Sequence, residues 1–272
     1  MTHAERVSPA QLEPYLTRIG VPEPASADSA ALRRLHRAHL LAVPFENLSI
    51  HLGEPISLAP GDLLAKVVGR HRGGFCYELN GAFALLLEGL GFGVRRVAAR
   101  VYGAGGKLGP PFDHLALLAD VPGGGTWLAD VGFGSHSSYP LDFARRNEDQ
   151  DDPGGVFRLV PAADGDLDVL RNGEPQYRLE PRTRDLDEFA PTCWWQQTWP
   201  GSHFRQSTIC SRLTPSGRVS LSGRTLIETR DGTRTETTLS TDEAVLAAYA
   251  GHFGIDLDRV PEAVAVTPNG SR

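Results

Sequence analysis

The chain has 272 residues, of which 40% are hydrophobic and 22% charged, a composition typical of a globular protein with a substantial core. Its 27 Lys and Arg against 33 Asp and Glu give a formal charge of −6, which argues against a nucleic-acid partner or an anionic membrane surface. No apolar run reaches the ~18 residues of a membrane span, and residues 1–6 lack the apolar core of a signal peptide, so a cytoplasmic location is the default expectation.

Residues 1–91 are predicted to be helical, because apolar residues recur at helical spacing and turn-forming residues interrupt them. Three helices are expected: 29–40, capped by Asp28 or Ser29 and ended by Pro44; 61–68; and 76–90, closed by Gly91.

Residues 92–190 have a different character, with short β-branched and apolar runs separated by Gly, Pro and Asp. This pattern predicts a small sheet or barrel, whereas the polar and acidic segment 147–155 is expected to be a surface loop. The expected strands are 94–102, 114–118, 127–131, 157–160, 167–170 and 176–179.

Residues 191–272 mix strands with a final helix. Runs 217–222, 224–229 and 233–239 predict an antiparallel meander. A capping box at residues 240–243 predicts a helix over 244–253. The residues after Pro261 are expected to be loose.

The most informative run is Arg72-Gly73-Gly74-Phe75-Cys76-Tyr77-Glu78-Leu79-Asn80. Two glycines permit a close backbone approach, and the thiol of Cys76 then stands at the start of a helix. Exposed N–H groups and the helix dipole favour an anion there, which is the reactive form of cysteine.

His114 and Asp130 are the candidate base and orienting group for this thiol. They lie in two predicted strands joined by a short turn, so the strands are expected to pair and a His–Asp hydrogen bond to form between them. From spacing alone, simpler interpretations remain open: Cys76 as a small buried hydrophobe, His114 as a core histidine and Asp130 as a turn residue.

Cys193 and Cys210 form no CxxC pair with each other or with Cys76, so neither a disulfide framework nor a zinc site is expected. The histidines at 36, 39, 71 and 203 lack metal-ligand spacing and are assigned surface or packing roles. No metal is therefore expected.

Four motifs in order resemble those of the bacterial arylamine N-acetyltransferases, and the resemblance covers almost the full length. They are Leu35-His36-Arg37-Ala38-His39-Leu40 leading to Val43-Pro44-Phe45-Glu46-Asn47-Leu48, the run around Cys76, Asp113-His114-Leu115, and Asp130-Val131-Gly132-Phe133-Gly134.

The resemblance implies an α+β fold with an N-terminal helical bundle, a central β-barrel and a C-terminal α/β lid around a cysteine-proteinase-like catalytic core. It implies Cys76 as nucleophile, His114 as its proton partner and Asp130 as the residue that orients His114. By motif position, Phe45 and Phe133 are candidates for the substrate pocket, as is Phe204 in the run Ser202-His203-Phe204, which also resembles the bacterial members.

The implied reaction is acetyl transfer from acetyl-coenzyme A to an arylamine, hydrazine or arylhydroxylamine by a ping-pong mechanism through acetyl-Cys76. A cationic His114 is expected to lower the pKa of Cys76 and hold a resting ion pair. Lys107, in a glycine-rich loop, is a candidate contact for coenzyme A phosphates, although a solvated lysine is the favoured interpretation.

The segment 193–200 departs from the family pattern, because three tryptophans lie within six residues and are expected to reshape the acceptor pocket. This departure keeps an amide synthase, fed by a carrier protein, open as an alternative. A cysteine hydrolase would use the same three residues, whereas a catalytically silent binding protein is disfavoured because all three are present.

Overall fold

The computed structural model describes residues 9–263, so the expectation for residues 1–6 and most of that for the tail after Pro261 fall outside it. The N-terminal helices are α1 Pro9–Ile19, α2 Ser29–Ala42, α3 Leu48–Leu52, α4 Pro60–Leu64 and α5 Cys76–Gly89. Asp28 caps α2 by accepting a hydrogen bond from the Ala31 N–H at 2.7 Å, as predicted. The helix expected at 61–68 is α4 followed by a π-helical turn, Ala65–Gly69.

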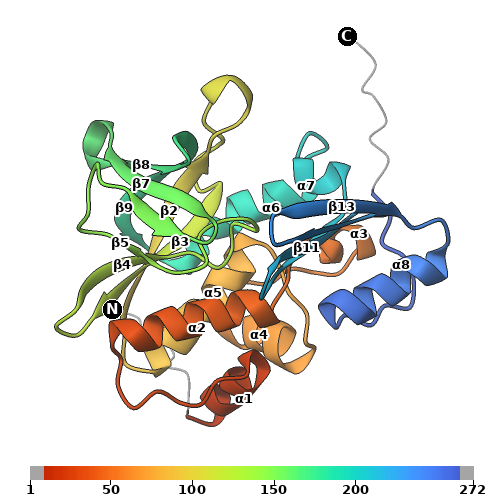
Figure 1. Ribbon diagram of the computed structural model, residues 1–272, viewed down its shortest axis with the longest axis horizontal. Coiled ribbons are helices and arrows are strands. Elements are labelled where there is room, and N and C mark those ends of the chain that lie inside the picture. The colour runs from red at the N-terminus through yellow and green to blue at the C-terminus, as the bar shows by residue number, and fades with distance from the viewer. Residues whose placement is uncertain (1–8, 264–272) are drawn as a thin grey trace.

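Helix α5 lies in the middle of the molecule (Figure 1). Twelve consecutive residues from its start, Cys76 to Leu87, are buried, which is the property of a helix covered on all sides. Its apolar residues pack with α1, α2 and α4 on one side and with strand residues such as Leu117 and Ala119 on the other. The residue that carries the thiol is therefore held by the core of the protein.

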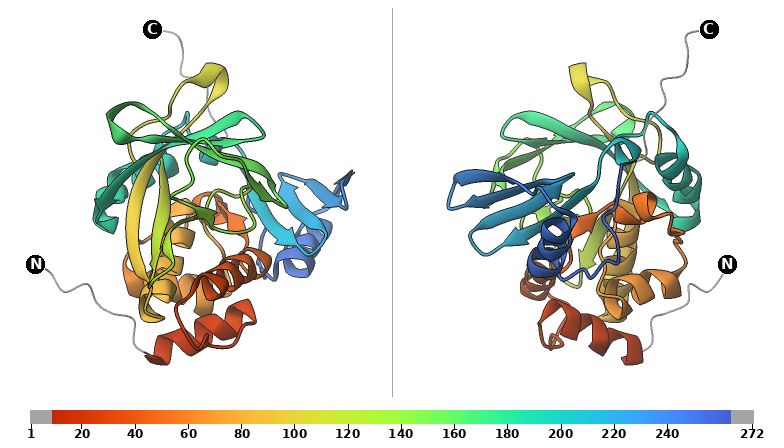
Figure 2. Two further views of the ribbon diagram at one scale, coloured as in Figure 1. Left: turned by 60° about the vertical axis from the view of Figure 1, so that its left-hand side comes forward. Right: turned by 90° about the vertical axis from the view of Figure 1, so that its right-hand side faces the viewer.

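Eight antiparallel strands form the central sheet in the order β5-β4-β3-β2-β9-β8-β7-β6. The sheet curls into a nearly closed barrel (Figure 2). The side chain of Gln150 in β6 bonds both backbone groups of Asp142 in β5, at 2.8 and 3.0 Å, and so links the two edge strands. The strands are β2 Gly93–Val101, β3 His114–Val121, β4 Gly125–Ala129, β5 Leu141–Asp142, β6 Gln150–Asp152, β7 Gly155–Pro161, β8 Leu167–Arg171 and β9 Glu174–Arg184.

The predicted loop at 147–155 is partly wrong, because it contains β6 and the turn into β7. Its acidic residues are typical of a loop, but here they are exposed or bond backbone groups. The carboxylate of Asp152, for example, accepts from the N–H groups of Ser138 and Tyr139 at 2.7 and 3.0 Å.

A second antiparallel sheet has the order β1-β10-β11-β12-β13. It unites a two-residue strand from the N-terminal part, β1 Phe45–Glu46, with the C-terminal meander, of which β10 was not predicted. The sheet and helix α8 lie beside the barrel (Figure 1). The strands are β10 Ile209–Thr214, β11 Gly217–Ser222, β12 Thr225–Arg230 and β13 Thr233–Thr238.

Three more helices complete this part: α6 Ala190–Thr198, α7 His203–Gln206 and α8 Asp242–Ala248. Helix α8 continues as a π-helical turn, Tyr249–Phe253, and its cap is Thr241, one residue later than the predicted box begins. Within residues 9–263, no helix combines the length and the apolar character that crossing a bilayer requires.

Candidate active site

Cys76 is the first residue of α5, and the turn before it is built by close approach of backbones. A Cβ on Gly73 would lie 1.9 Å from the carbonyl oxygen of Pro44, and one on Gly74 would lie 2.6 Å from a carboxylate oxygen of Glu78. Neither glycine has a positive φ, so they are needed for space, as predicted, rather than for an unusual backbone conformation. The N–H of Glu46 in β1 donates to the carbonyl of Gly74 at 2.8 Å.

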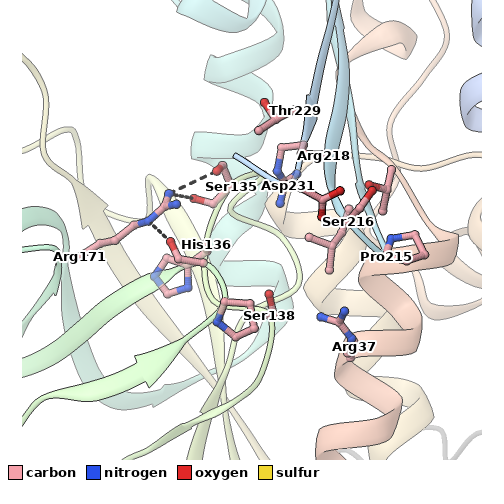
Figure 3. Close-up of a pocket in the computed structure, with 15 residues that line it drawn as sticks. Arg37, Ser135, His136, Ser138, Arg171, Pro215, Ser216, Arg218, Thr229 and Asp231 are labelled. Carbon is pink, nitrogen blue, oxygen red and sulfur yellow. Dashed lines mark hydrogen bonds between the residues drawn. The ribbon is translucent and has the colours of Figure 1, made fainter. Parts of the chain in front are cut away.

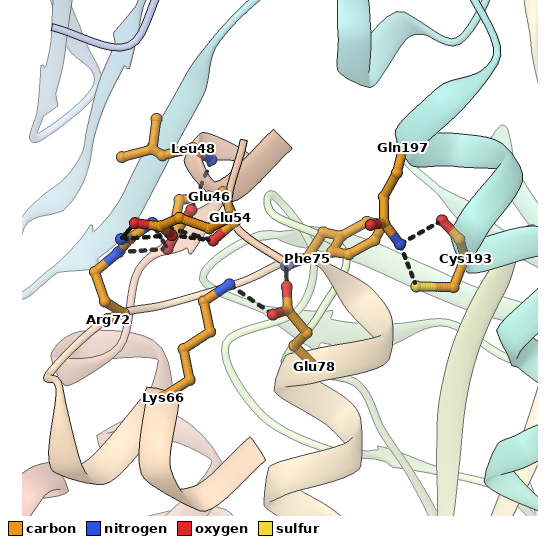
Figure 4. A network of polar contacts seen from close by, with 10 residues as sticks. Glu46, Leu48, Glu54, Lys66, Arg72, Phe75, Glu78, Cys193 and Gln197 are labelled. Atoms are coloured by element: carbon orange, nitrogen blue, oxygen red, sulfur yellow. Dashed lines mark hydrogen bonds and ion pairs between the residues drawn. The ribbon is translucent and has the colours of Figure 1, made fainter. Parts of the chain in front are cut away.

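Buried ion pairs stabilise the turn before Cys76 (Figure 4). The guanidinium of Arg72 donates to Glu46 at 3.0 Å and to Glu54 at 3.2 Å. Burial opposes the charge of Glu46, but the cations of Lys66 and Arg72 outweigh it and lower the pKa of Glu46. The pair therefore ties β1 to the segment that leads into Cys76.

Glu78, in the first turn of α5, has two partners. Its carboxylate accepts from the N–H of Phe75 at 3.3 Å and from Lys66 at 2.6 Å. An acidic side chain here satisfies an otherwise free N–H of the helix start and suits the helix dipole. The orientation of the Cys76 turn is thus fixed by two buried ion pairs.

His114 and Asp130 form a hydrogen bond of 2.7 Å between Nε2 and Oδ2. Strands β3 and β4 pair directly, so the predicted hairpin and its His–Asp contact are confirmed. One detail differs: Asp130 follows the last residue of β4 instead of lying in the strand. There its Oδ1 also accepts the N–H of Gly132 at 3.0 Å, which turns the chain back over α5.

Asp130 is held in place by two residues that were not predicted to belong to the site. Asn80 donates to Asp130 Oδ1 at 2.9 Å and accepts from the Val131 N–H at 3.0 Å. His36, predicted only to pack or to lie at the surface, is fully buried, and its Nε2 accepts the N–H of Asp130 at 3.2 Å. His36 lies in the motif run 35–40 and Asn80 in the run 72–80. These positions were the sequence signal that could have assigned both residues to the site.

A cavity of about 360 Å³ contains Cys76 and His114 together with the three predicted pocket residues, Phe45, Phe133 and Phe204. Phe133 packs edge-on against the ring of His114, with centroids 5.2 Å apart. The side chains of Cys76, His114 and Asp130 belong to residues that are only 4%, 2% and 1% exposed. The cavity therefore connects the thiol to solvent.

The Cys76 thiol lies 4.0 Å from the carbonyl oxygen of Asp113, the residue before His114. Burial raises the pKa of Cys76 well above its ordinary value, and nearby Asp113 and Asp130 add to this effect. Burial therefore opposes the lowering of this pKa that was expected from a cationic His114. A thiolate at this position requires a neighbouring cation.

Asp130 is ionised where it meets His114. Burial by itself would raise the pKa of Asp130, but His114 and the amide of Asn80 outweigh burial and hold the pKa well below its usual range. The carboxylate orients the ring of His114 through their hydrogen bond. Among residues 9–263, no cluster of three or more His, Cys, Asp or Glu side chains suits a metal ion.

The tryptophans of segment 193–200 lie beside this cavity instead of inside it. Trp195 and Trp199 stack with centroids 4.6 Å apart and line a groove of about 730 Å³, which shares Asp113 and His203 with the cavity of Cys76. Trp194 is 64% exposed. The segment thus extends the approach to the thiol, and its tryptophans do not line the cavity around the thiol.

Comparisons with known proteins agree with this arrangement. A family model described as N-acetyltransferase matches residues 28–261. The arylamine N-acetyltransferase of Mycolicibacterium smegmatis is 35% identical over 253 residues, 89% of this chain and 91% of the relative. A solved M. smegmatis arylamine N-acetyltransferase gives a TM-score of 0.85 at 34% identity, covering 93% of this chain and 96% of the other.

A further solved structure, the arylamine N-acetyltransferase of Mycobacterium marinum in complex with CoA, gives a TM-score of 0.83 at 32% identity and covers 90% of this chain and 92% of the other. Both structures contain an α+β fold of the kind described above. The similarity extends over most of the chain in each comparison.

Proposed function

Because this chain belongs to the arylamine N-acetyltransferase family of acyltransferases, we propose that Cys76 carries an acetyl group from acetyl-coenzyme A to an arylamine, a hydrazine or an arylhydroxylamine. The observation that most supports this proposal is that Cys76 and His114 line one aromatic cavity, while Asp130 hydrogen-bonds His114 and so orients its ring. A nucleophile, a base and an orienting carboxylate in this order are the parts that acyl transfer through a covalent intermediate needs.

The first half-reaction transfers the acetyl group to the enzyme. His114 holds the proton of Cys76, and the thiolate attacks the carbonyl carbon of the thioester. Backbone N–H groups at the start of α5 stabilise the oxyanion that forms. The bond between the carbonyl carbon and the sulfur of coenzyme A then breaks, His114 returns its proton to the departing sulfur, and acetyl-Cys76 remains.

The second half-reaction transfers the acetyl group to the acceptor. The acceptor nitrogen attacks acetyl-Cys76, His114 takes the proton of that nitrogen, and the bond to Sγ breaks to give the amide and the thiolate. Phe45, Phe133 and Phe204 offer ring surfaces on which a flat aromatic amine stacks. The stacked Trp195 and Trp199 extend these surfaces for larger acceptors.

Mass spectrometry after brief mixing with acetyl-coenzyme A, without an acceptor, tests this function. We expect a persistent adduct of one acetyl group on Cys76, which disappears when an aromatic amine is added and does not form in Cys76→Ser. A hydrolase would release acetate without a persistent adduct. An amide synthase fed by a carrier protein would leave acetyl-coenzyme A unchanged. Either result would overturn the proposal.

A further inference from the structure

His36 in α2 holds both ends of the loop that follows strand β4. Its Nε2 lies 3.2 Å from the backbone nitrogen of Asp130, and its Nδ1 lies 3.2 Å from the carbonyl oxygen of Ser138. We call residues 130–138 the active-site loop, because they contribute Phe133 to the cavity that holds the thiol. One imidazole thus bonds the first and the last residue of this loop.

The active-site loop has no regular secondary structure of its own, since it lies between the end of β4 and the start of β5. The other side chains that bond its ends reach one end each. Asn80 accepts the N–H of Val131 at 3.0 Å near the start, and Asp152 accepts the N–H of Ser138 at 2.7 Å at the end. In the part of the chain that the structure describes, His36 is the one side chain that bonds both ends.

The two bonds together specify the state of the ring. A carbonyl oxygen can only accept a hydrogen bond, and a backbone N–H can only donate one. Nδ1 therefore carries the hydrogen and Nε2 offers its lone pair, so the neutral Nδ1–H tautomer of His36 is the state that makes both bonds. A proton on Nε2 would face the N–H of Asp130 and break that bond. His36 therefore acts through its position and not through proton transfer.

Burial keeps His36 in this neutral state. The residue is 0% exposed, and burial lowers the pKa of its ring, although the carboxylates of Asp130 and Asp152 favour the charged form. Two further titratable groups interact with it, His39 on its own helix and His136 on the active-site loop. Burial lowers the pKa of His39 to about 3 and that of His136 to about 4. All three rings are therefore neutral at neutral pH.

The position of the active-site loop matters because the loop contacts the ring of His114 twice. Phe133 packs edge-on against this ring, with centroids 5.2 Å apart, and Asp130 bonds its Nε2 at 2.7 Å. A loop that moved by about 1 Å would displace both contacts, and misplacement of this size costs about 100-fold at a reacting centre.

We propose that His36 is a positioning residue for acyl transfer: as a neutral imidazole it fixes the active-site loop at both ends and thereby sets how the loop contacts His114. This inference rests on the proposed function, because the role of His114 does. It gives a task to a buried histidine of the first motif run that the reaction steps do not use.

Three replacements separate the two bonds. His36→Phe keeps a ring and removes both bonds. In His36→Gln the side-chain oxygen reaches the place of Nε2 and can accept from Asp130, whereas in His36→Asn the amide stands where Nδ1 stood and can donate to Ser138. His39→Phe is the matched control, since it replaces a buried histidine of the same helix that bonds Tyr15 instead of the loop.

Burst kinetics with p-nitrophenyl acetate measures the amount of active enzyme and its rate separately. The burst amplitude counts folded enzyme that becomes acetylated, and the rate constant reports how well the site is positioned. For His36→Phe we expect the rate constant to fall about 10- to 100-fold at an amplitude near that of the parent. His36→Gln should recover most of this loss, because it restores the bond to Asp130, and His36→Asn should recover less. His39→Phe should keep the parental rate constant within about twofold.

Two further measurements do not depend on activity. Nitrogen NMR of the histidine rings in the parent should show His36 as the neutral Nδ1–H tautomer from about pH 8 to about pH 5. Hydrogen exchange followed by mass spectrometry should show the amides of residues 130–138 exchanging at least about tenfold faster in His36→Phe than in the parent. In His39→Phe these amides should exchange at the parental rate. The NMR measurement remains decisive if His36→Phe fails to fold.

A burst in His36→Phe that loses amplitude but keeps the parental rate constant would show a purely structural role and overturn the inference. An equal loss of rate in His39→Phe, a His36→Gln as slow as His36→Phe, or a protonated or Nε2–H ring in the parent would overturn it as well. If the parent forms no acetyl-enzyme from p-nitrophenyl acetate or from acetyl-coenzyme A, the proposed function fails instead. The tautomer and the exchange of the loop amides then still test whether His36 holds the loop.

Discussion

Asn80 donates its side-chain amide to Oδ1 of Asp130 at 2.9 Å, one helical turn after Cys76 on the same face of α5. One helix therefore positions the proposed nucleophile directly and the proposed orienting carboxylate through a hydrogen bond. The same amide donates to the carbonyl of Leu115 at 2.6 Å, beside His114. Asn80 thus connects all three elements of the proposed catalytic site.

Replacing Asn80 should impair catalysis more than folding. In Asn80→Ala we expect kcat to fall roughly 10- to 100-fold, or about 1.4 to 2.8 kcal/mol of barrier, because Asp130 loses a partner that fixes its position. In Asn80→Asp, the added negative charge should raise the pKa of Asp130 and move the acid limb of the pH–rate profile to higher pH. Gln176→Ala, near the start of β9, is the control. An unshifted acid limb in Asn80→Asp would assign Asn80 a purely structural role.

Gly132 allows the loop after Asp130 to pass close to the backbone of Cys76. An added Cβ would lie 2.7 Å from both the Cα of Cys76 and the amide nitrogen of Asn80. Gly132→Ala should therefore push the loop away and reduce kcat/KM at least about 100-fold, since small misplacements are costly at a reacting centre. Steady-state kinetics measures this. Gly251→Ala, where nothing lies within 4 Å of the new Cβ, should be neutral, and equal activity of the two variants would refute the packing argument.

The reactivity of Cys76 should depend on His114. Burial raises the pKa of this thiol, so without an imidazolium the thiolate fraction at pH 7 is small. We expect iodoacetamide to alkylate Cys76 at least about tenfold more slowly in His114→Asn, with a rate that rises about tenfold per pH unit as the thiolate fraction does. The experiment uses a Cys193→Ala/Cys210→Ala background, so that Cys76 is the only cysteine that can be alkylated. Alkylation at the parental rate would show that another group supplies the positive charge.

The contact between His114 and Asp130 was predictable because it is local: two strands and a short turn place the residues together. The resemblance also identified Phe45, Phe133 and Phe204, which the structure brings into one cavity from β1, the loop after β4 and α7. The order of the motifs identified these residues as pocket candidates, although their spacing along the chain does not show that they meet in one cavity.

Other features were not predictable, because they depend on contacts between distant segments. Strand β1 has two residues and forms by pairing with β10 from the C-terminal part of the chain. The buried His36 bonds the N–H of Asp130, 94 residues later, and its place in a motif run does not by itself show this contact. The cavity between the barrel and the five-stranded sheet brings together Arg37, Arg171 and Arg218 from three elements (Figure 3), and no short motif contains more than one of them.

The buried pair of Arg72 and Glu46 should contribute strongly to stability, since their side chains are 8% and 0% exposed. Arg72→Met leaves Glu46 as a buried charge and should lower the free energy of unfolding by about 3 to 5 kcal/mol. Adding Glu46→Gln should recover part of this loss, because the unpaired charge is then absent. Urea denaturation measures each value. Arg234→Met, which breaks an exposed pair, should cost at most about 1 kcal/mol, and a similar cost at both sites would contradict the role of burial.

His39 should make the protein sensitive to acid. It is fully buried and bonded through Nδ1 to the hydroxyl of Tyr15 at 3.0 Å, and burial, followed by nearby His36 and Arg18, lowers the pKa of His39 to about 3. The unfolded chain takes up a proton at His39 near pH 6.5, whereas the folded protein keeps it neutral. Between pH 6.5 and about 3, His39 should therefore reduce the free energy of unfolding by about 1.4 kcal/mol per pH unit.

Replacing His39 by phenylalanine, whose ring does not titrate, tests this dependence of stability on pH. In His39→Phe, the slope of the unfolding free energy against pH should become less steep by about that amount between pH 6 and 4. The reference variant is His71→Asn, at an exposed position with a φ of 54° that asparagine tolerates. It should keep the parental slope. If His39→Phe retains the full slope, the acid sensitivity lies in another group, and His136, whose pKa burial lowers to about 4, is the next residue to replace.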